Sequence, residues 1–128
     1  MKDRIKFSDE MLDAVIDGRK TQTRRLIEPQ PSAGTEVSVV NKTFPYKLTD
    51  GTIPFADKDG CEKGMLKVIS VHIHSIHDIS TADAIAEGFD KKSPRHSFMQ
   101  EWINIYGAHN WIENPWVWVI EFKQIQEG

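Results

Sequence analysis

Near its C-terminus the chain reads Trp116-Val117-Trp118-Val119-Ile120-Glu121-Phe122, and this segment decides the fold. A strand would place four of its bulky side chains on one face, because side chains alternate along a strand: Trp116, Trp118, Ile120 and Phe122. Aromatic and β-branched residues are also those that strands favour. We therefore predict a central β-strand that covers a large hydrophobic core.

Segments upstream carry the same alternation. Ile5 and Phe7 predict a short, half-buried strand. A further strand is expected around Leu26-Ile27, and Pro29 ends it because proline cannot donate to a ladder. Residues 36–40 predict another extended piece.

A longer strand is predicted at residues 65–76. Its apolar residues change parity between Val68 and Ile69, which indicates a β-bulge or burial on both faces. The stretch 29–64 holds most of the prolines and glycines and two Asp-Gly turn dipeptides. We expect a long hairpin or an insertion there.

Two short helices are predicted by their end signals. Ser8 is a suitable N-cap for the first, and Gly18 the C′ residue that ends it. Residues 81–87 predict the second. It starts at Ser80 with a capping-box-like pattern and ends at Gly88.

A third helix is predicted to begin at Ser93-Pro94, since serine caps helices and proline suits their first position. Gly107 ends it. Helical spacing places one apolar stripe on this helix, formed by Phe98, Trp102 and Ile105.

These elements predict an α+β fold: a small mixed β-barrel of five to six strands with about three short helices. No regular βαβ alternation is present, which argues against a doubly wound sheet. The length of 128 residues predicts one domain, residues 1–128, with the loop-rich hairpin or insertion at 29–64.

The composition is that of an ordinary soluble domain, with 39% hydrophobic and 27% charged residues. No apolar run approaches the roughly 20 residues that a membrane-spanning helix needs. The start of the chain lacks the apolar core of a signal peptide. The single Cys61 excludes an internal disulfide and suits a reducing compartment, so we expect a cytoplasmic protein that contacts no membrane.

Positive charge gathers in one place, Gly18-Arg19-Lys20-Thr21-Gln22-Thr23-Arg24-Arg25. Four cations and two hydroxyls in eight residues stand out in a chain of net charge -3. Overall charge would not attract an anionic partner, so such a cluster predicts a local anion or nucleic-acid contact. Its residues would be Arg19, Thr21, Arg24 and Arg25, with Lys20 beside them. A solvated basic turn is the alternative.

Three blocks of this chain resemble ASCH-domain proteins, a branch of the PUA-like superfamily. They are Ile5 to Phe7 with the run from Gly18 to Arg25, Ala84-Ile85-Ala86-Glu87-Gly88, and residues 115–122. Two segments, Thr-Gln-Thr-Arg-Arg at residues 21–25 and Asn-Pro-Trp-Val-Trp-Val at residues 114–119, are similar to the corresponding sequences of phage and prophage members. Relatives there usually carry a Gly-Asp-x-Leu-Trp-Val-Arg-Glu strand, whereas this chain has Gly34-Thr35-Glu36-Val37-Ser38-Val39, without the Trp, Arg and Glu.

The resemblance implies a PUA-like β-barrel whose cleft takes RNA or nucleosides. Small bacterial members are amidohydrolases that remove the acetyl group from N4-acetylcytidine, and their catalytic residues correspond to Lys20, Thr23 and Glu87. Other members are ribonucleases or RNA-binding modules, so the resemblance leaves the activity open.

The same three residues can be read by their chemistry alone. Glu87 would lie at a helix C-terminus, where the helix dipole disfavours a carboxylate, so a cation such as Lys20 or Arg19 is expected to compensate it. Neighbouring cations and burial lower the pKa of a lysine, which suits a base. The hydroxyl of Thr23 needs such a base to act as a nucleophile. Ordinary surface roles are the alternative for all three.

Other candidates are weaker. Four aromatic residues could stack on a nucleobase: Phe44, Tyr46, Phe55 and Trp111. His72, His74 and His77 have the spacing of metal ligands, but no carboxylate or second cysteine completes a set, so we expect neither a metal nor another cofactor.

Two functions of different class remain open. The first is a hydrolase acting on a modified nucleoside through Lys20, Thr23 and Glu87, with a small nucleoside or RNA as partner. The second is an RNA-binding module without catalysis, with a ribonuclease between the two. Salt dependence separates them, because phosphate binding weakens steeply as salt rises. The acidic balance of the chain favours the small ligand.

Overall fold

Strand β5 (Trp116–Ile125) lies inside a five-stranded sheet in the computed structural model, which describes residues 1–31, 44–89 and 92–125. The strands in spatial order are β1 (Ile5–Lys6), β3 (Thr52–Ala56), β4 (Glu62–Ser75), β5 and β2 (Gln22–Leu26). β1 pairs with β3 in parallel, and the other neighbours are antiparallel. The sheet is therefore mixed, with β1 and β2 at its two edges.

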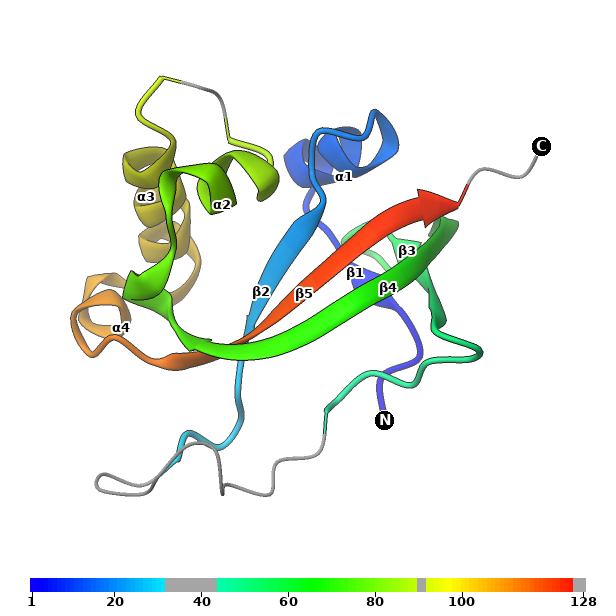
Figure 1. The fold of residues 1–128 in the computed structure, drawn as a ribbon, viewed down its shortest axis with the longest axis horizontal. Coiled ribbons are helices and arrows are strands. Elements are labelled where there is room, and N and C mark those ends of the chain that lie inside the picture. The colour runs from blue at the N-terminus through cyan, green and yellow to red at the C-terminus, as the bar shows by residue number, and fades with distance from the viewer. Residues whose placement is uncertain (32–43, 90–91, 126–128) are drawn as a thin grey trace.

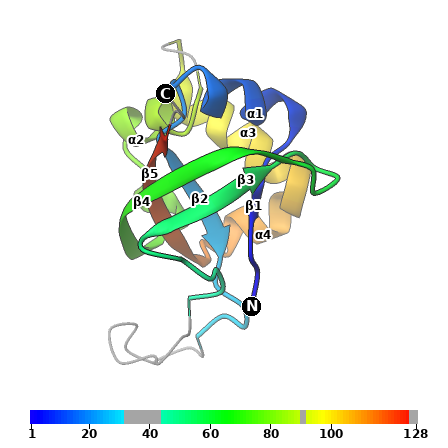
Figure 2. The same cartoon turned by 90° about the vertical axis from the view of Figure 1, so that its right-hand side faces the viewer.

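The sheet curls into a half-barrel, so that β2 lies behind β3 and β4 in Figure 2. Within β4 the pairing with β5 shifts between Val68 and Ser70. This confirms the predicted bulge, and Ile69 at the bulge is exposed. A bulge bends its strand and increases the local twist, which favours the curl.

Helices occupy the open side and one end of the sheet (Figure 1). The described residues form α1 (Asp9–Ile16), α2 (Thr81–Ala86), α3 (Pro94–Tyr106), α4 (Ala108–Ile112) and the short 3₁₀ helix η2 (Ile76–Asp78). The α+β class and the small PUA-like barrel are thus confirmed. The helix α4 was not predicted.

The ends of α1 and α2 follow the predicted signals. The hydroxyl of Ser8 accepts a hydrogen bond from the backbone N–H of Met11 at 3.4 Å. Gly18 follows α1 with a φ of 85°, a conformation that glycine adopts without strain. Ser80 and Asp83 form the predicted capping box of α2.

The prediction for α3 was wrong in two details. Ser93 precedes the helix, but its side chain makes no capping hydrogen bond and its φ is 58°. On the apolar stripe, Phe98 and Trp102 are buried, whereas Ile105 is 61% exposed. Spacing puts the three on one face, but only Phe98 and Trp102 reach the core cluster of Val117 and Val119, and Ile105 in the last turn does not.

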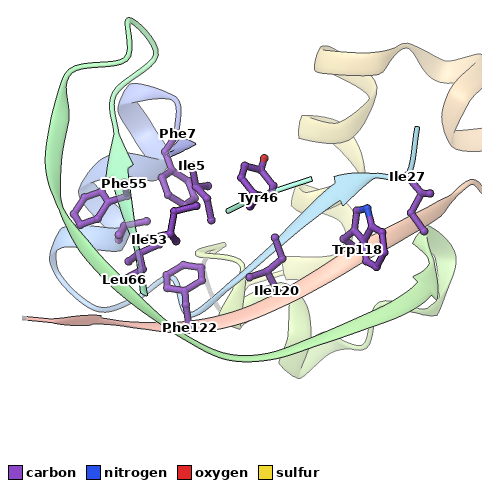
Figure 3. Packing of buried hydrophobic residues seen from close by; sticks show 11 residues of the cluster. Ile5, Phe7, Ile27, Tyr46, Ile53, Phe55, Leu66, Trp118, Ile120 and Phe122 are labelled. Carbon is purple, nitrogen blue, oxygen red and sulfur yellow. The ribbon is translucent and has the colours of Figure 1, made fainter. Parts of the chain in front are cut away.

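Strand β5 is buried on both faces. Trp118, Ile120 and Phe122 pack into a cluster on the concave side of the sheet, together with residues of β1, β3 and β4 (Figure 3). Val117 and Val119 point the other way, into a second cluster below α2 and α3. The first face was predicted, and the second follows because helices also cover the outer side of β5.

Part of the loop-rich stretch forms a hairpin. β3 and β4 pair across a tight turn at residues 57–61. There the carboxylate of Asp57 accepts hydrogen bonds from the backbone N–H groups of Asp59 and Cys61. The strand predicted at residues 36–40 lies outside the described residues. Among the described helices, none has the length and apolarity to cross a membrane.

At Gly64 the hairpin leaves no room for a side chain. This glycine pairs with Phe55, and a Cβ atom at Gly64 would lie 2.6 Å from the ring carbon Cε1 of that residue. Phe55 is fully buried and has little room to move. We expect Gly64→Ala to lower the free energy of unfolding by roughly 1–3 kcal/mol, measured by urea denaturation.

The double variant Gly64→Ala/Phe55→Leu is the matched control. Because a smaller side chain at position 55 relieves the clash, Gly64→Ala should cost clearly less in that background than in the natural one. An equal cost in both backgrounds would contradict the packing described here.

Candidate active site

Glu87 is the acidic centre of the site. It follows α2 directly as the C-cap residue and is only 3% exposed. α2 has no basic residue in its last turn, so nothing in the helix itself compensates this charge. The compensation comes from Lys20 and Arg24, more than sixty positions earlier in the chain.

Lys20 reaches Glu87 from the connection between α1 and β2. Its Nζ donates a hydrogen bond to the backbone oxygen of Glu87 at 2.7 Å and lies 3.4 Å from Oε1 of the carboxylate. Its backbone N–H donates to Ala14 in α1, which fixes the turn. The predicted meeting of this amine and this acid is therefore present in the fold.

Burial lowers the pKa of Lys20 from its ordinary value of 10.5. The negative charge of Glu87 acts in the opposite direction, and the nearby cations Arg25 and Arg24 add to the lowering. The net direction is downward. The amine thus loses its proton more easily than a surface lysine does.

Arg24 closes the charge network on the other side of Glu87. One guanidinium nitrogen donates to Oε2 of Glu87 at 3.1 Å and to the side-chain oxygen of Gln22 at 2.8 Å, and the other lies 3.4 Å from Asp83. The side chain of Arg24 is 1% exposed. The prediction that it binds an external phosphate was wrong, because Glu87 and Asp83 already neutralise it.

Gln22 and Asp83 were not predicted for the site. The amide of Gln22 donates to Asp83 at 3.2 Å, which completes a ring of contacts around Arg24. The sequence held a signal for both. Asp83 and Glu87 are four apart, so they share a face of α2, and Gln22 has the same strand parity as Arg24.

Thr23 contributes a hydroxyl to the same place. It is 4% exposed and lies on β2 opposite Ile120. Within the described part of the chain its hydroxyl makes no hydrogen bond, although it lines the cavity that Lys20 and Glu87 also line. Since β2 is an edge strand, residues of both parities can reach this cavity.

The cavity has a volume of about 120 Å³. One water needs roughly 10–15 Å³ by the same measure, so there is room for a small planar group. Lys20, Thr23, Arg24 and Glu87 form its polar side. Other lining residues come from the end of β1 and the residues after it, from α1 and from α3. They include the apolar side chains of Phe7, Met11, Trp102 and Ile105 and a second acid, Glu101.

Arg25 also lines the cavity, at the seam between the two edge strands. Its guanidinium donates to the backbone oxygen of Lys6 at 2.9 Å and lies 5.3 Å from the ring centre of Phe7. β1 and β2 do not pair with each other. The side chain of Arg25 therefore links β2 to β1, although the two strands do not pair.

The remaining members of the basic run point elsewhere. Arg19 is exposed and pairs with Asp17 at 2.7 Å, so it does not compensate Glu87. Thr21 lines a separate cavity next to α1, and its backbone links Ala86 of α2 to Phe122 of β5. Neither residue lines the cavity that Lys20 shares with Thr23 and Glu87, although Lys20 also borders the cavity of Thr21.

The predicted stacking residues separate into three groups. Phe55 is fully buried in the core and cannot meet a base without unfolding, so that prediction was wrong. Phe44 packs edge-on against Trp118, and Tyr46 is buried while lining two cavities beside the site. Trp111 packs against Phe98 in the second core cluster, away from the cavity.

His72 and His74 of β4 and His77 of η2 show no metal-binding geometry. The rings of His72 and His74 stack with centroids 5.9 Å apart, and Nε2 of His77 lies 2.7 Å from the backbone oxygen of Trp111. In residues 1–31, 44–89 and 92–125, no cluster of three histidine, cysteine or acidic side chains is placed to hold a metal ion.

Solved structures of other proteins share this fold. A protein from Enterococcus faecalis of the family DUF984 matches with a TM-score of 0.60 and 19% identity, over 98% of this chain and 80% of its own. An ASCH domain from Lactobacillus crispatus matches with 0.58 and 16%, over 94% and 79%. A hypothetical protein named PH0355 matches with 0.54 and 18%, over 98% and 100%.

No protein-family model matches the chain, and no curated protein does either. The likeness therefore rests on structure, and at these identities it concerns the fold. The chain has the fold of an ASCH domain, as its sequence predicted.

Removing the charge of Glu87 should be costly. The variant Glu87→Gln leaves the buried cations Lys20 and Arg24 with Asp83 as their one remaining carboxylate among the described residues. We expect the free energy of unfolding to fall by roughly 3–5 kcal/mol, measured by urea denaturation at pH 7.

The exposed pair of Asp17 and Arg19 supplies the control. Asp17→Asn removes a contact of similar length at the surface, where solvent screens it, and should leave stability nearly unchanged. Equal effects of the two substitutions would show that the Glu87 network does not hold α2 to β2.

Proposed function

We propose that this domain hydrolyses an acyl-amide on a modified nucleoside, with N4-acetylcytidine as the type of substrate. One observation carries the proposal: a buried amine touches a buried carboxylate in a cavity that a threonine hydroxyl also lines, and this hydroxyl has no hydrogen-bond partner among the described residues. Lys20, Glu87 and Thr23 are the residues concerned.

A gain in stability does not by itself explain why the protein buries the ion pair of Lys20 and Glu87. Taking charges out of water costs several kcal/mol per ion, and a hydrophobic replacement is often as stable. Buried ionisable groups with shifted pKa values gather at sites of chemistry. A cavity beside the pair adds room for a substrate, which a purely structural ion pair does not need.

In one route Thr23 is the nucleophile. Its oxygen attacks the acetyl carbon while the neutral amine of Lys20 accepts the hydroxyl proton. The C–N bond then breaks, and the proton passes from Lys20 to the departing exocyclic nitrogen. Water next hydrolyses the threonine ester, which releases acetate and frees the hydroxyl.

In the other route Glu87 accepts a proton from a water molecule that attacks the acetyl carbon directly. Thr23 then donates a hydrogen bond to the developing oxyanion. Lys20 carries the proton to the leaving nitrogen. Both routes consume one water and give the free base and acetate.

RNA binding without catalysis has less support from the charges. Glu87 and Asp83 neutralise Lys20 and Arg24, and Asp17 pairs with Arg19. Arg25 is the one cation of the basic run that makes no ion pair in the described residues. A groove for an extended RNA or a ribonuclease substrate would need more unpaired cations than this.

Substitutions distinguish the two routes. If Thr23 is the nucleophile, Thr23→Val should lower kcat by about 100-fold or more, because the covalent step is lost, while Thr23→Ser keeps activity. Lys20→Met should be inactive in both routes. The assay follows the release of cytidine from N4-acetylcytidine by chromatography.

Thr21→Val is the matched control, because that hydroxyl lines a different cavity, and it should keep full activity. Activity at the natural level in Lys20→Met and Thr23→Val would end the proposal.

The pH profile tests the role of Lys20. The amine acts as a base only when neutral, so kcat/KM should rise with pH through the pKa of Lys20. Because burial lowers that pKa, the inflection should fall below 10.5.

Arg25→Gln removes a cation that lowers the same pKa, and should move the inflection to higher pH. Arg19→Gln, whose charge lies outside the cavity, should leave it in place. A shift to lower pH in Arg25→Gln would contradict the assignment of the base.

A further inference from the structure

A second, larger cavity adjoins the catalytic one. It has a volume of about 600 Å³ and shares Lys6 and Arg25 with the lining of the first. Its other lining residues are Lys2, Asp3 and Arg4 at the start of the chain, Tyr46, and Asp59 and Gly60 in the turn between β3 and β4. The proposed reaction makes no use of this cavity.

The charge in this second cavity is unlike that of the whole chain. Four of its eight lining residues are lysine or arginine and two are aspartate, in a protein of net charge -3. Arg4 is occupied, because it pairs with Asp3 at 3.1 Å and with Glu62 at 3.5 Å. Asp59 is the other acid at the rim.

Three cations of the lining remain without a carboxylate partner in the described residues: Lys2, Lys6 and Arg25. Lys2 lies over the ring of Tyr46, 5.7 Å from its centre. Such contacts hold a cation in place but leave its charge unneutralised. An anionic ligand would supply the missing charge.

The guanidinium of Arg25 is positioned to bind such a ligand. Its contacts with Lys6 and Phe7 fix the guanidinium, and one of its five N–H donors is used in the described structure. A fixed, planar guanidinium with spare donors suits the oxygens of a phosphate.

We propose that Lys2, Lys6 and Arg25 bind a phosphate ester on the sugar of the substrate, so that the natural substrate is a nucleotide or a nucleotide unit in RNA. The inference rests on the proposed function for the neighbouring cavity. The base would enter the cavity of Lys20 and Thr23, and the phosphate would lie on the other side of Arg25. Three cations fit one or two phosphates rather than a long strand.

A third cavity continues the same side of the molecule. It has a volume of about 440 Å³ and shares Lys2, Arg25 and Tyr46 with the second. Tyr106 of α3 stands on its wall as well as on that of the catalytic cavity. A neighbouring nucleotide of an RNA therefore has a place beside the phosphate site.

Binding experiments test the phosphate site without relying on hydrolysis. Isothermal titration calorimetry would compare cytidine, its 5′- and 3′-monophosphates, and the dinucleotide of cytidine. We expect at least one phosphorylated ligand to bind about tenfold more tightly than cytidine at low salt. Preference for a monophosphate indicates a free nucleotide, and preference for the dinucleotide alone indicates RNA.

The double variant Lys2→Gln/Lys6→Gln should reduce this preference to about twofold or less, because two of the three cations are lost while Lys20, Thr23 and Glu87 of the base cavity are kept. Lys63→Gln is the matched control, since that lysine does not line the cavity and pairs with Asp57, and it should keep the preference. Circular dichroism would establish that each variant is folded.

Equal affinity for cytidine and all phosphorylated ligands would overturn the inference, even if the protein deacetylates N4-acetylcytidine. A phosphate preference that survives Lys2→Gln/Lys6→Gln would overturn the assignment to these residues. A preference that depends on both lysines would support the site even in a protein with no hydrolase activity.

Discussion

The contact of Glu87 with Lys20 and Arg24 is the interaction on which the rest of the structure depends. It joins the end of α2 to the edge strand β2, and these segments lie more than sixty residues apart in the sequence. Removing either side would leave charge buried without compensation, which costs far more than a surface pair. The helices therefore cannot leave the sheet edge without exposing the network, and the cavity between them persists.

The basic residues around the site differ in what they contact. Lys20 and Arg24 are neutralised by acids inside the protein, whereas Arg25, next along the chain, makes its contacts with a backbone oxygen and an aromatic ring. Arg24 and Arg25 are neighbours on β2 and point to opposite faces of the strand, which explains why only Arg24 meets the acids Glu87 and Asp83. One short basic run therefore contains two cations of a buried charge network, Lys20 and Arg24, and one cation without an acidic partner among the described residues, Arg25.

Much of the fold could be predicted from local patterns. Ser8, Gly18 and the Ser80–Asp83 box marked helix ends, and the parity change after Val68 marked the bulge, because each of these depends on a few neighbouring residues. Burial was harder to predict. Ile105 shares a stripe with Phe98 and Trp102 and yet is exposed where they are buried, and Phe55 was a candidate for stacking on a nucleobase although it is core.

The amino-acid sequence by itself determined the strands β1, β2, β4 and β5, the ends of α1 and α2, the ASCH-type blocks and the expectation that Lys20, Thr23 and Glu87 share one site. Only the tertiary structure decided which cation faces which acid. It assigned Arg24 to Glu87 and Asp83, left Arg19 at the surface, and placed Arg25 at the seam between β1 and β2. The physical reason is that pairing and burial depend on distances across the fold, which spacing along a chain does not contain.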